Sequence, residues 1–212
     1  MAIRWSLRGT TILRRVVVAA AAFSCVLLLS APVQASEAEA YVRQIAEKLE
    51  PLLQNGHLTP QSVDAFLQSN IVGELDMDRI AKYVLRNHWS EISGEDQKKF
   101  MSIFRYFIVE NFKRQLVKYS NAEIRIIRSV EHEPEGVSVI TRVRVPSKSP
   151  LNMNWRLFRD NDRLKIFDVS VQGISKLSAT RSEYKSVLDE HGFQYLLKQI
   201  CAKLEGPHPA SC

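Results

Sequence analysis

The chain has 212 residues, with 29 Lys and Arg against 23 Asp and Glu, a formal net charge of +6, and only three cysteines. Four of the basic residues and none of the acidic ones fall in the first 35 positions, so the rest of the chain carries 25 basic and 23 acidic residues. This near balance argues against a nucleic-acid-binding protein, which normally keeps a large basic excess. Two cysteines beyond position 35 are too few for a scaffold built on disulfides.

The first 35 residues have the pattern of a secretory signal peptide. Arginines at positions 4, 8, 14 and 15 precede an apolar run over residues 16–29, and the segment ends in Val33-Gln34-Ala35 before Ser36. The run is shorter than the roughly 20 residues that span a bilayer. An uncleaved membrane anchor, a twin-arginine leader or a lipoprotein built on Cys25 are the alternatives. We therefore expect a signal peptide over residues 1–35, one domain over 36–206 and a flexible tail over 207–212.

Helical spacing of apolar residues dominates the first half of this domain. Ser36 and Glu39 form a capping box for a first helix, and Thr59-Pro60 begins a second. A third is expected from about Met77 to Trp89. Ser93 caps a long fourth helix that ends near residue 119. Its wide aromatic stripe is Phe100, Ile103, Phe104, Phe107, Ile108, Phe112, Leu116 and Tyr119.

The period then changes from 3.6 to 2, which is typical of strands. We expect strands over residues 123–130, 137–145, 151–157 and 163–171, with turns at 134–136 and 160–162. Two helices follow: one capped by Ser178 and ending at His191-Gly192, and a last one that buries Leu196, Leu197 and Ile200. Runs of helices followed by runs of strands indicate an α+β fold. We predict helices packed on a four-stranded, twisted antiparallel sheet that encloses an apolar cavity.

Residues with the spacing of a catalytic or metal site are scarce. The five histidines lie in different elements without a ligand partner at i+3 or i+4. No G-x-S-x-G motif and no glycine-rich phosphate loop occur. Cys201 falls on the apolar stripe of the last helix; whether it pairs with Cys212 stays open. We expect no metal, no cofactor and no catalytic residue.

Asp168 is the carboxylate that interrupts an apolar strand pattern. Some cavity-bearing α+β folds use a strand carboxylate as a general base. The simpler interpretation is that Asp168 accepts hydrogen bonds from backbone or from an arginine such as Arg181. Arg125, Arg128, Arg142 and Arg144 lie on the polar faces of two neighbouring strands; they fit either a solvated face or contact with lipid head groups or an acidic partner.

Two stretches resemble the MlaC or toluene-tolerance (Ttg2-type) family of periplasmic phospholipid-binding proteins. The first is IAKYVLRNHW over residues 80–89 together with Ser93, Asp96 and the spaced Phe100 and Phe104. The second is LKIFDVSVQGIS over residues 164–175, followed by Arg181 and by HGFQYL over residues 191–196. The likeness covers nearly all of residues 37–204. Arg86, Leu164 and Gln172 stand where the family usually has Gly, Trp and Glu.

This resemblance implies a periplasmic carrier that is not an enzyme. It would shuttle a phospholipid or related lipid between an outer-membrane lipoprotein complex and an inner-membrane ABC-type transporter complex, with no nucleic acid involved. A related branch of the family is associated with hopanoid lipids. The motif that contains Ile174 borders the lipid in the family. From the strand and helix patterns we expect eight lipid-binding residues: Tyr83, Val84, Phe104, Ile108, Val143, Trp155, Leu157 and Ile174. A secreted enzyme with Asp168 as base, and an adaptor with a fully packed core, are the competing hypotheses.

Overall fold

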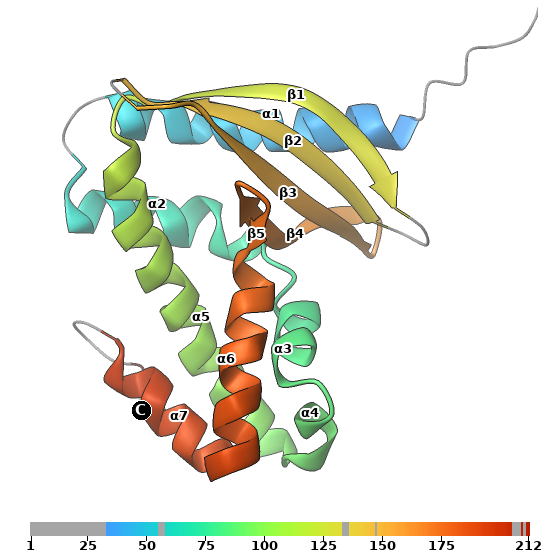
Figure 1. Ribbon diagram of the computed structural model, residues 1–212, viewed down its shortest axis with the longest axis vertical. Helices are drawn as coiled ribbons and strands as arrows, with labels where there is room; N and C mark the ends of the chain where they lie inside the picture. The colour runs from blue at the N-terminus through green and yellow to red at the C-terminus, as the bar shows by residue number, and fades with distance from the viewer. Residues whose placement is uncertain (1–32, 55–57, 133–135, 147, 205–208, 210) are drawn as a thin grey trace, which may run out of the picture. The chain divides into compact units, whose positions relative to one another are not determined.

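The computed structural model describes residues 33–54, 58–132, 136–146, 148–204, 209 and 211–212 (Figure 1). The predicted signal peptide and the turn at 134–136 therefore lie largely outside the described residues. Nine helical segments are described: α1 (Val33–Gln54), α2 (Pro60–Asn70), η1 (Val72–Glu74), α3 (Met77–Leu85), α4 (His88–Glu91), α5 (Gly94–Leu116), η2 (Val117–Tyr119), α6 (Lys176–His191) and α7 (Phe193–Ala202). None of these helices combines the length and apolar character that crossing a bilayer requires.

The strands form one antiparallel sheet in sequence order: β1 (Glu123–His132), β2 (Gly136–Arg144), β3 (Leu151–Asp160), β4 (Arg163–Val171) and β5 (Ile174–Ser175). The α+β prediction is confirmed, with one strand more than expected. The extra strand exists because Gln172 and Gly173 both adopt positive φ. This two-residue turn sends the chain back along β4, with Ile174 opposite Val171.

One face of the sheet, here called the inner face, carries Val137, Val139, Thr141 and Val143 of β2, all buried. Helix α1 packs along β1 and β2 (Figure 1), and its Glu39 accepts a hydrogen bond from Ser129 Oγ at 2.7 Å. Glu39 is therefore not part of a capping box. The helix begins before Ser36, at Val33, so the predicted cap is wrong.

Strand β4 differs from β2 because helices also cover its outer face. A bulge between Arg156 and Leu157 of β3 shifts the register against β4, and residues 166–169 are all buried. The α3 side chain Tyr83 meets Phe167 there, and the first turn of α6 meets Asp168. A strand buried on both faces loses the apolar–polar alternation that a half-buried strand shows.

The predicted third helix stops early, at Leu85. Arg86 follows with φ 52° and ψ −126°, a conformation that costs a residue with a Cβ about 1–3 kcal/mol. The chain then starts the short α4 at His88. The position where the family usually has Gly is thus a position that needs positive φ.

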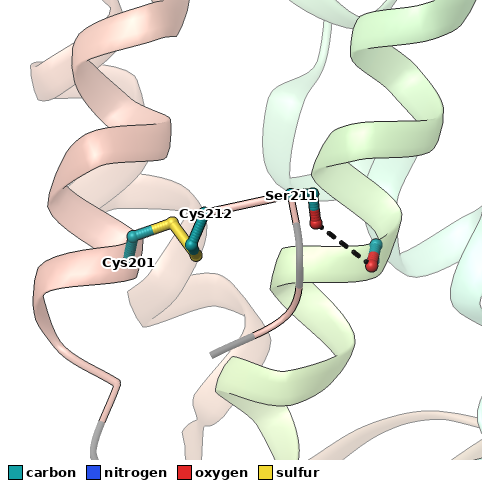
Figure 2. The surroundings of a disulfide bond; sticks show 4 residues. Cys201, Ser211 and Cys212 are labelled. Atoms are coloured by element: carbon teal, nitrogen blue, oxygen red, sulfur yellow. Dashed lines mark hydrogen bonds between the residues drawn. A yellow bond between two sulfur atoms is a disulfide. The ribbon is translucent and has the colours of Figure 1, made fainter. Parts of the chain in front are cut away.

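The end of the chain is attached to two helices. Cys201 of α7 and Cys212 form a disulfide (Figure 2). The neighbouring Ser211 donates a hydrogen bond to Ser102 Oγ of α5 at 3.3 Å. The last residues of the segment expected to be a flexible tail are therefore held against α5 and α7.

Candidate functional site

Most of the predicted lipid-binding residues meet in one apolar core. Val84, Phe104, Trp155 and Leu157 are buried members of a single core that joins the inner sheet face to the helices, here called the main core, and Tyr83 and Ile108 pack against it. Val143 belongs to a separate small core with Leu49, Leu53, Ala122 and Val145. Ile174 is 65% exposed on β5.

The inner face of the sheet supplies the flat side of the main core. Trp155 lies opposite Val139, and Leu157 lies opposite Val137, in the β2–β3 register. The Trp155 indole Nε1–H donates to Thr141 Oγ1 at 3.1 Å. Because its one polar atom is satisfied within the sheet, the rest of the Trp155 ring is available for apolar contact.

The aromatic stripe of α5 faces other helices. Phe100 and Phe104 stack with ring centroids 5.0 Å apart, and Tyr184 of α6 meets Phe104 edge-on at 5.8 Å. The main neighbours of α5 are α2, α3 and α7. The α5 stripe therefore packs mainly against other helices, and its apolar pattern alone did not identify them as its partners.

Tyr184 is a core residue with an unusual polar atom. Its side chain is 2% exposed, and its hydroxyl has no hydrogen-bond partner among the described residues. Burial raises the pKa of this phenol well above its usual range. Nothing in the sequence pattern signals a buried hydroxyl without a partner at this position.

Two of the hollows in the described part of the chain lie among the helices. One has a volume of about 780 Å³ and is bordered mainly by polar side chains with Trp89, Met101 and Tyr106. The second, about 200 Å³, lies between the end of α3 and α6. Val84 is the one predicted lipid-binding residue that borders either of these two hollows. An apolar cavity lined by the eight residues thus stays a prediction.

Asp168 has the structural role that the simpler interpretation gave it. Its side chain is 7% exposed and accepts from Ser175 Oγ at 2.6 Å and from the Leu177 N–H at 3.1 Å. Both carboxylate oxygens therefore hold the start of α6. Arg181, named as a possible partner, lies instead over the Tyr83 ring, with its guanidinium carbon 4.7 Å from the centroid.

A group of aromatic rings and arginines lies beside Asp168, and sequence reasoning missed it. Phe167 meets Tyr83 edge-on at 5.3 Å and Phe158 edge-on at 5.2 Å. Guanidinium groups lie against these rings: Arg79 over Phe158 at 4.5 Å, Arg156 over Phe167 at 5.5 Å, and Arg181 over Tyr83. We call these six residues the arginine–aromatic cluster: Arg79, Tyr83, Arg156, Phe158, Phe167 and Arg181.

The environment of Tyr83 in this cluster is electropositive. Its hydroxyl is 3.1 Å from Ser178 Oγ. The pKa of the Tyr83 phenol is lowered, mainly by the hydrogen bond with Ser178, and the charges of Arg181 and Arg156 contribute less. Burial, the second-largest effect, acts in the opposite direction and only partly offsets this lowering of the pKa.

Metal-ligating side chains do not gather in the part of the chain that the structure describes: no group of three or more His, Cys, Asp or Glu could hold an ion there. His88 is bonded through Nδ1 to Glu91 at 2.8 Å and lies 3.5 Å from Asp189 through Nε2. Its contacts connect α4 to α6.

Comparisons with known proteins agree with this architecture. The intermembrane phospholipid transport system binding protein MlaC of Haemophilus influenzae is 24% identical over 149 residues, which is 66% of this chain and 68% of that protein. The fold is shared with the phospholipid-binding protein from Ralstonia solanacearum, solved in complex with a phospholipid. That match has a TM-score of 0.65 and 17% identity, and it covers 78% of this chain and 93% of that one. The family model described as MlaC protein matches residues 40–202, and the chain therefore belongs to the MlaC family.

Proposed function

We propose that this protein is a periplasmic carrier that binds a phospholipid by its acyl chains and moves it between membranes without covalent chemistry. The observation that carries the proposal is the family match over residues 40–202, which includes both the sheet and the helices of the main core. The relatives support the choice of ligand, since one is named for phospholipid transport and the other was solved with a phospholipid.

The physical need for such a carrier follows from the hydrophobic effect. Each methylene exposed to water costs about 0.8 kcal/mol, so two acyl chains of some 30 carbons cost on the order of 20 kcal/mol in the aqueous periplasm. A protein that shelters both chains must offer a comparable apolar surface. In this chain that surface is the main core, where Trp155 and Leu157 of the sheet and Val84 of α3 belong to one continuous set.

Because side chains of the main core are in mutual contact, entry of acyl chains requires them to separate. The loosely attached parts of this core are the partly buried side chains at its margin, among them Tyr83, Ile108 and Met153. Ile174 lies on the hairpin between β4 and α6, where an exposed isoleucine could meet a lipid tail as it enters. We assign these positions to the path of the lipid.

The same proposal places loading and unloading at membrane complexes: an outer-membrane lipoprotein complex on one side and an inner-membrane ABC-type transporter on the other. An enzymatic role for Asp168 is disfavoured, because its oxygens are engaged by Ser175 and Leu177. A general base must instead be open to the substrate proton it removes.

The test is purification of the secreted protein without detergent, followed by mass spectrometry and phosphorus analysis of the extracted lipid. About one phospholipid per protein is the expected result. A bound hopanoid in its place would change the identity of the ligand and leave the carrier function supported. A protein that contains no lipid, and takes none from vesicles of dioleoylphosphatidylglycerol, would contradict the proposal.

Two exposed isoleucines provide a test variant and a matched control for the path of the lipid. Ile174 on β5 and Ile127 at the bulge of the edge strand β1 are 65% and 50% exposed. Ile174→Glu should lower bound phospholipid severalfold and leave the fold intact, whereas Ile127→Glu should leave occupancy unchanged. Equal occupancy in both variants would remove Ile174 from the path.

A further inference from the structure

The arginine–aromatic cluster brings three cations together from three elements. Arg79 comes from α3, Arg156 from β3 and Arg181 from α6, and each guanidinium lies 4.5–5.6 Å from the centroid of a ring. A guanidinium that stacks on a ring uses its face for that contact. Its N–H groups point outward from its edge and stay available for an acceptor with two oxygens.

Two of these three cations have no acidic partner among the described residues. Arg79 is paired with Asp76, with 2.8 Å between Nε and Oδ2. Across the residues that the structure describes, neither Arg156 nor Arg181 has a carboxylate oxygen within 4.0 Å. Asp168 lies opposite Arg156 in the β3–β4 register, but its oxygens are bonded to Ser175 and Leu177.

Uncharged hydroxyl groups lie beside these arginines. The Tyr83 hydroxyl and Ser178 Oγ lie 3.1 Å apart in an exposed position, and Arg181 lies over the same Tyr83 ring. The positive end of the α6 helix dipole is close by, because Ser175 is the N-cap of α6. Tyr83 therefore has both a hydroxyl partner, Ser178, and a cation, Arg181, in direct contact with it.

The cluster also touches the apolar interior. Phe167 is 6% exposed and belongs to the main core, and Tyr83 packs against that core. The Tyr83–Phe167 pair therefore contacts the main core and also carries the guanidiniums of Arg156, on Phe167, and of Arg181, on Tyr83. A phospholipid needs this combination, since its chains are apolar and its phosphate is an anion at every physiological pH.

We propose that Arg156 and Arg181, held on Phe167 and Tyr83, form a binding site for a phosphate group. The ligand group is a phosphate or phosphate ester, whose oxygens accept pairs of N–H bonds from each guanidinium. In the carrier proposed above, its source is the headgroup of the bound phospholipid, and this assignment rests on that proposed function. Free inorganic phosphate has the same chemistry, and the experiment separates the two sources.

The experiment compares the secreted protein with Arg156→Gln/Arg181→Gln. Arg43→Gln/Arg163→Gln is the matched control, because it removes two exposed arginines that lie outside the cluster. Each protein is loaded from vesicles of dioleoylphosphatidylglycerol, and the ³¹P resonance of the bound lipid is recorded. In parallel, lipid-free protein is titrated with inorganic phosphate and followed by backbone amide NMR.

For a headgroup site, the ³¹P resonance should move in Arg156→Gln/Arg181→Gln and stay in place in the control. Transfer of the lipid to acceptor vesicles should be about tenfold faster, since a lost charge-assisted hydrogen bond is worth about that factor. A second outcome is that inorganic phosphate shifts amide resonances near α6 only in proteins with both arginines, while the ³¹P resonance of the bound lipid does not change. This outcome would support the phosphate site and show that the lipid headgroup is not its ligand.

Unchanged ³¹P resonance together with an unchanged phosphate titration would overturn the proposal. Arg156→Lys/Arg181→Lys keeps the charge and loses the paired N–H geometry. It should show an intermediate phosphate affinity, so the result does not depend on whether the glutamine variant folds. The phosphate titration needs no lipid, and therefore it still decides the site if the wild-type protein proves to carry no phospholipid.

Discussion

Replacing Arg86 with Gly should stabilise the protein, although the change removes a whole side chain. Arg86 follows α3 with φ 52° and ψ −126°, where a Cβ atom clashes with the backbone and glycine does not. The Arg86 N–H donates to the Lys82 carbonyl at 2.9 Å, and its carbonyl accepts from the Trp89 N–H at 3.1 Å. These backbone bonds hold the conformation and do not depend on the side chain.

The expected size follows from two opposing effects. Relief of the strained conformation is worth about 1–3 kcal/mol. The extra freedom of glycine in the unfolded chain costs about 0.5–1 kcal/mol. The Arg86 side chain is exposed, so its removal contributes little in either direction. The net gain is about 1 kcal/mol, which in a domain of this size corresponds to a rise of about 2–4 °C in Tm.

Arg86→Ala is the control, because alanine also removes the guanidinium and yet keeps the Cβ that causes the strain. Both variants and the parent are unfolded with urea as lipid-free proteins, since bound ligand adds stability of its own. Arg86→Gly should exceed Arg86→Ala by about 1 kcal/mol or more. Equal stability of the two variants would show that the conformation at position 86 is not strained and would refute the reasoning.

Three further outcomes follow from the described contacts. Asp168→Asn replaces an acceptor of two hydrogen bonds at the start of α6 and should lower the free energy of unfolding by about 2–4 kcal/mol in a urea titration. Cys212→Ser opens the loop of sequence separation 11 and should destabilise the protein by up to about 3 kcal/mol in non-reducing buffer, with no difference from wild type once both are reduced. Burial raises the folded-state pKa of Tyr41 and Tyr184 above 10.0, so the unfolded chain loses these protons first and stability falls as pH rises above about 10. Tyr41→Phe/Tyr184→Phe should therefore lose stability less steeply than wild type between pH 10 and 11, and parallel curves would exclude this contribution.

The strands β2 and β3 show what the sequence could predict well. Strict alternation at Val137, Val139 and Val143 fixes which face is buried, since a slip by one residue would turn every valine to solvent. The structure pairs these residues with the apolar members of β3 as the alternation requires. Fold class was predictable for the same reason, because both periods, 3.6 and 2, appear in long uninterrupted segments.

The end of α3 shows where pattern reasoning fails. Apolar spacing continued through Trp89 and predicted an unbroken helix, yet the chain leaves helical geometry at Arg86. Nothing in the identity of an arginine signals positive φ. The signal was the departure from the family, where glycine is usual at this position, because glycine is the residue that a positive φ selects.

The candidate site was predicted only in part. Apolar residues could be assigned to a shared core, because apolar periodicity in the sequence indicates burial. Four of the eight predicted lipid-binding residues are buried there. Their partners could not be assigned, since a helix stripe as wide as that of α5 fits several neighbours. Ile174 was expected to be sheltered and is exposed, because the two-residue turn before it carries β5 away from the core.

The arginine–aromatic cluster could not be predicted from the sequence, because its members come from different elements. Arg156 stands between the buried Trp155 and Leu157 in β3, so alternation alone assigns it to a solvated face. The β3–β4 bulge places Phe167 on the side of Arg156, and α3 and α6 then bring Arg79 and Arg181 to the same rings. Cations that would otherwise be dispersed become neighbours at the margin of the apolar core. A ligand with apolar chains and an anionic group requires such a margin, and no periodicity within a single element can reveal it.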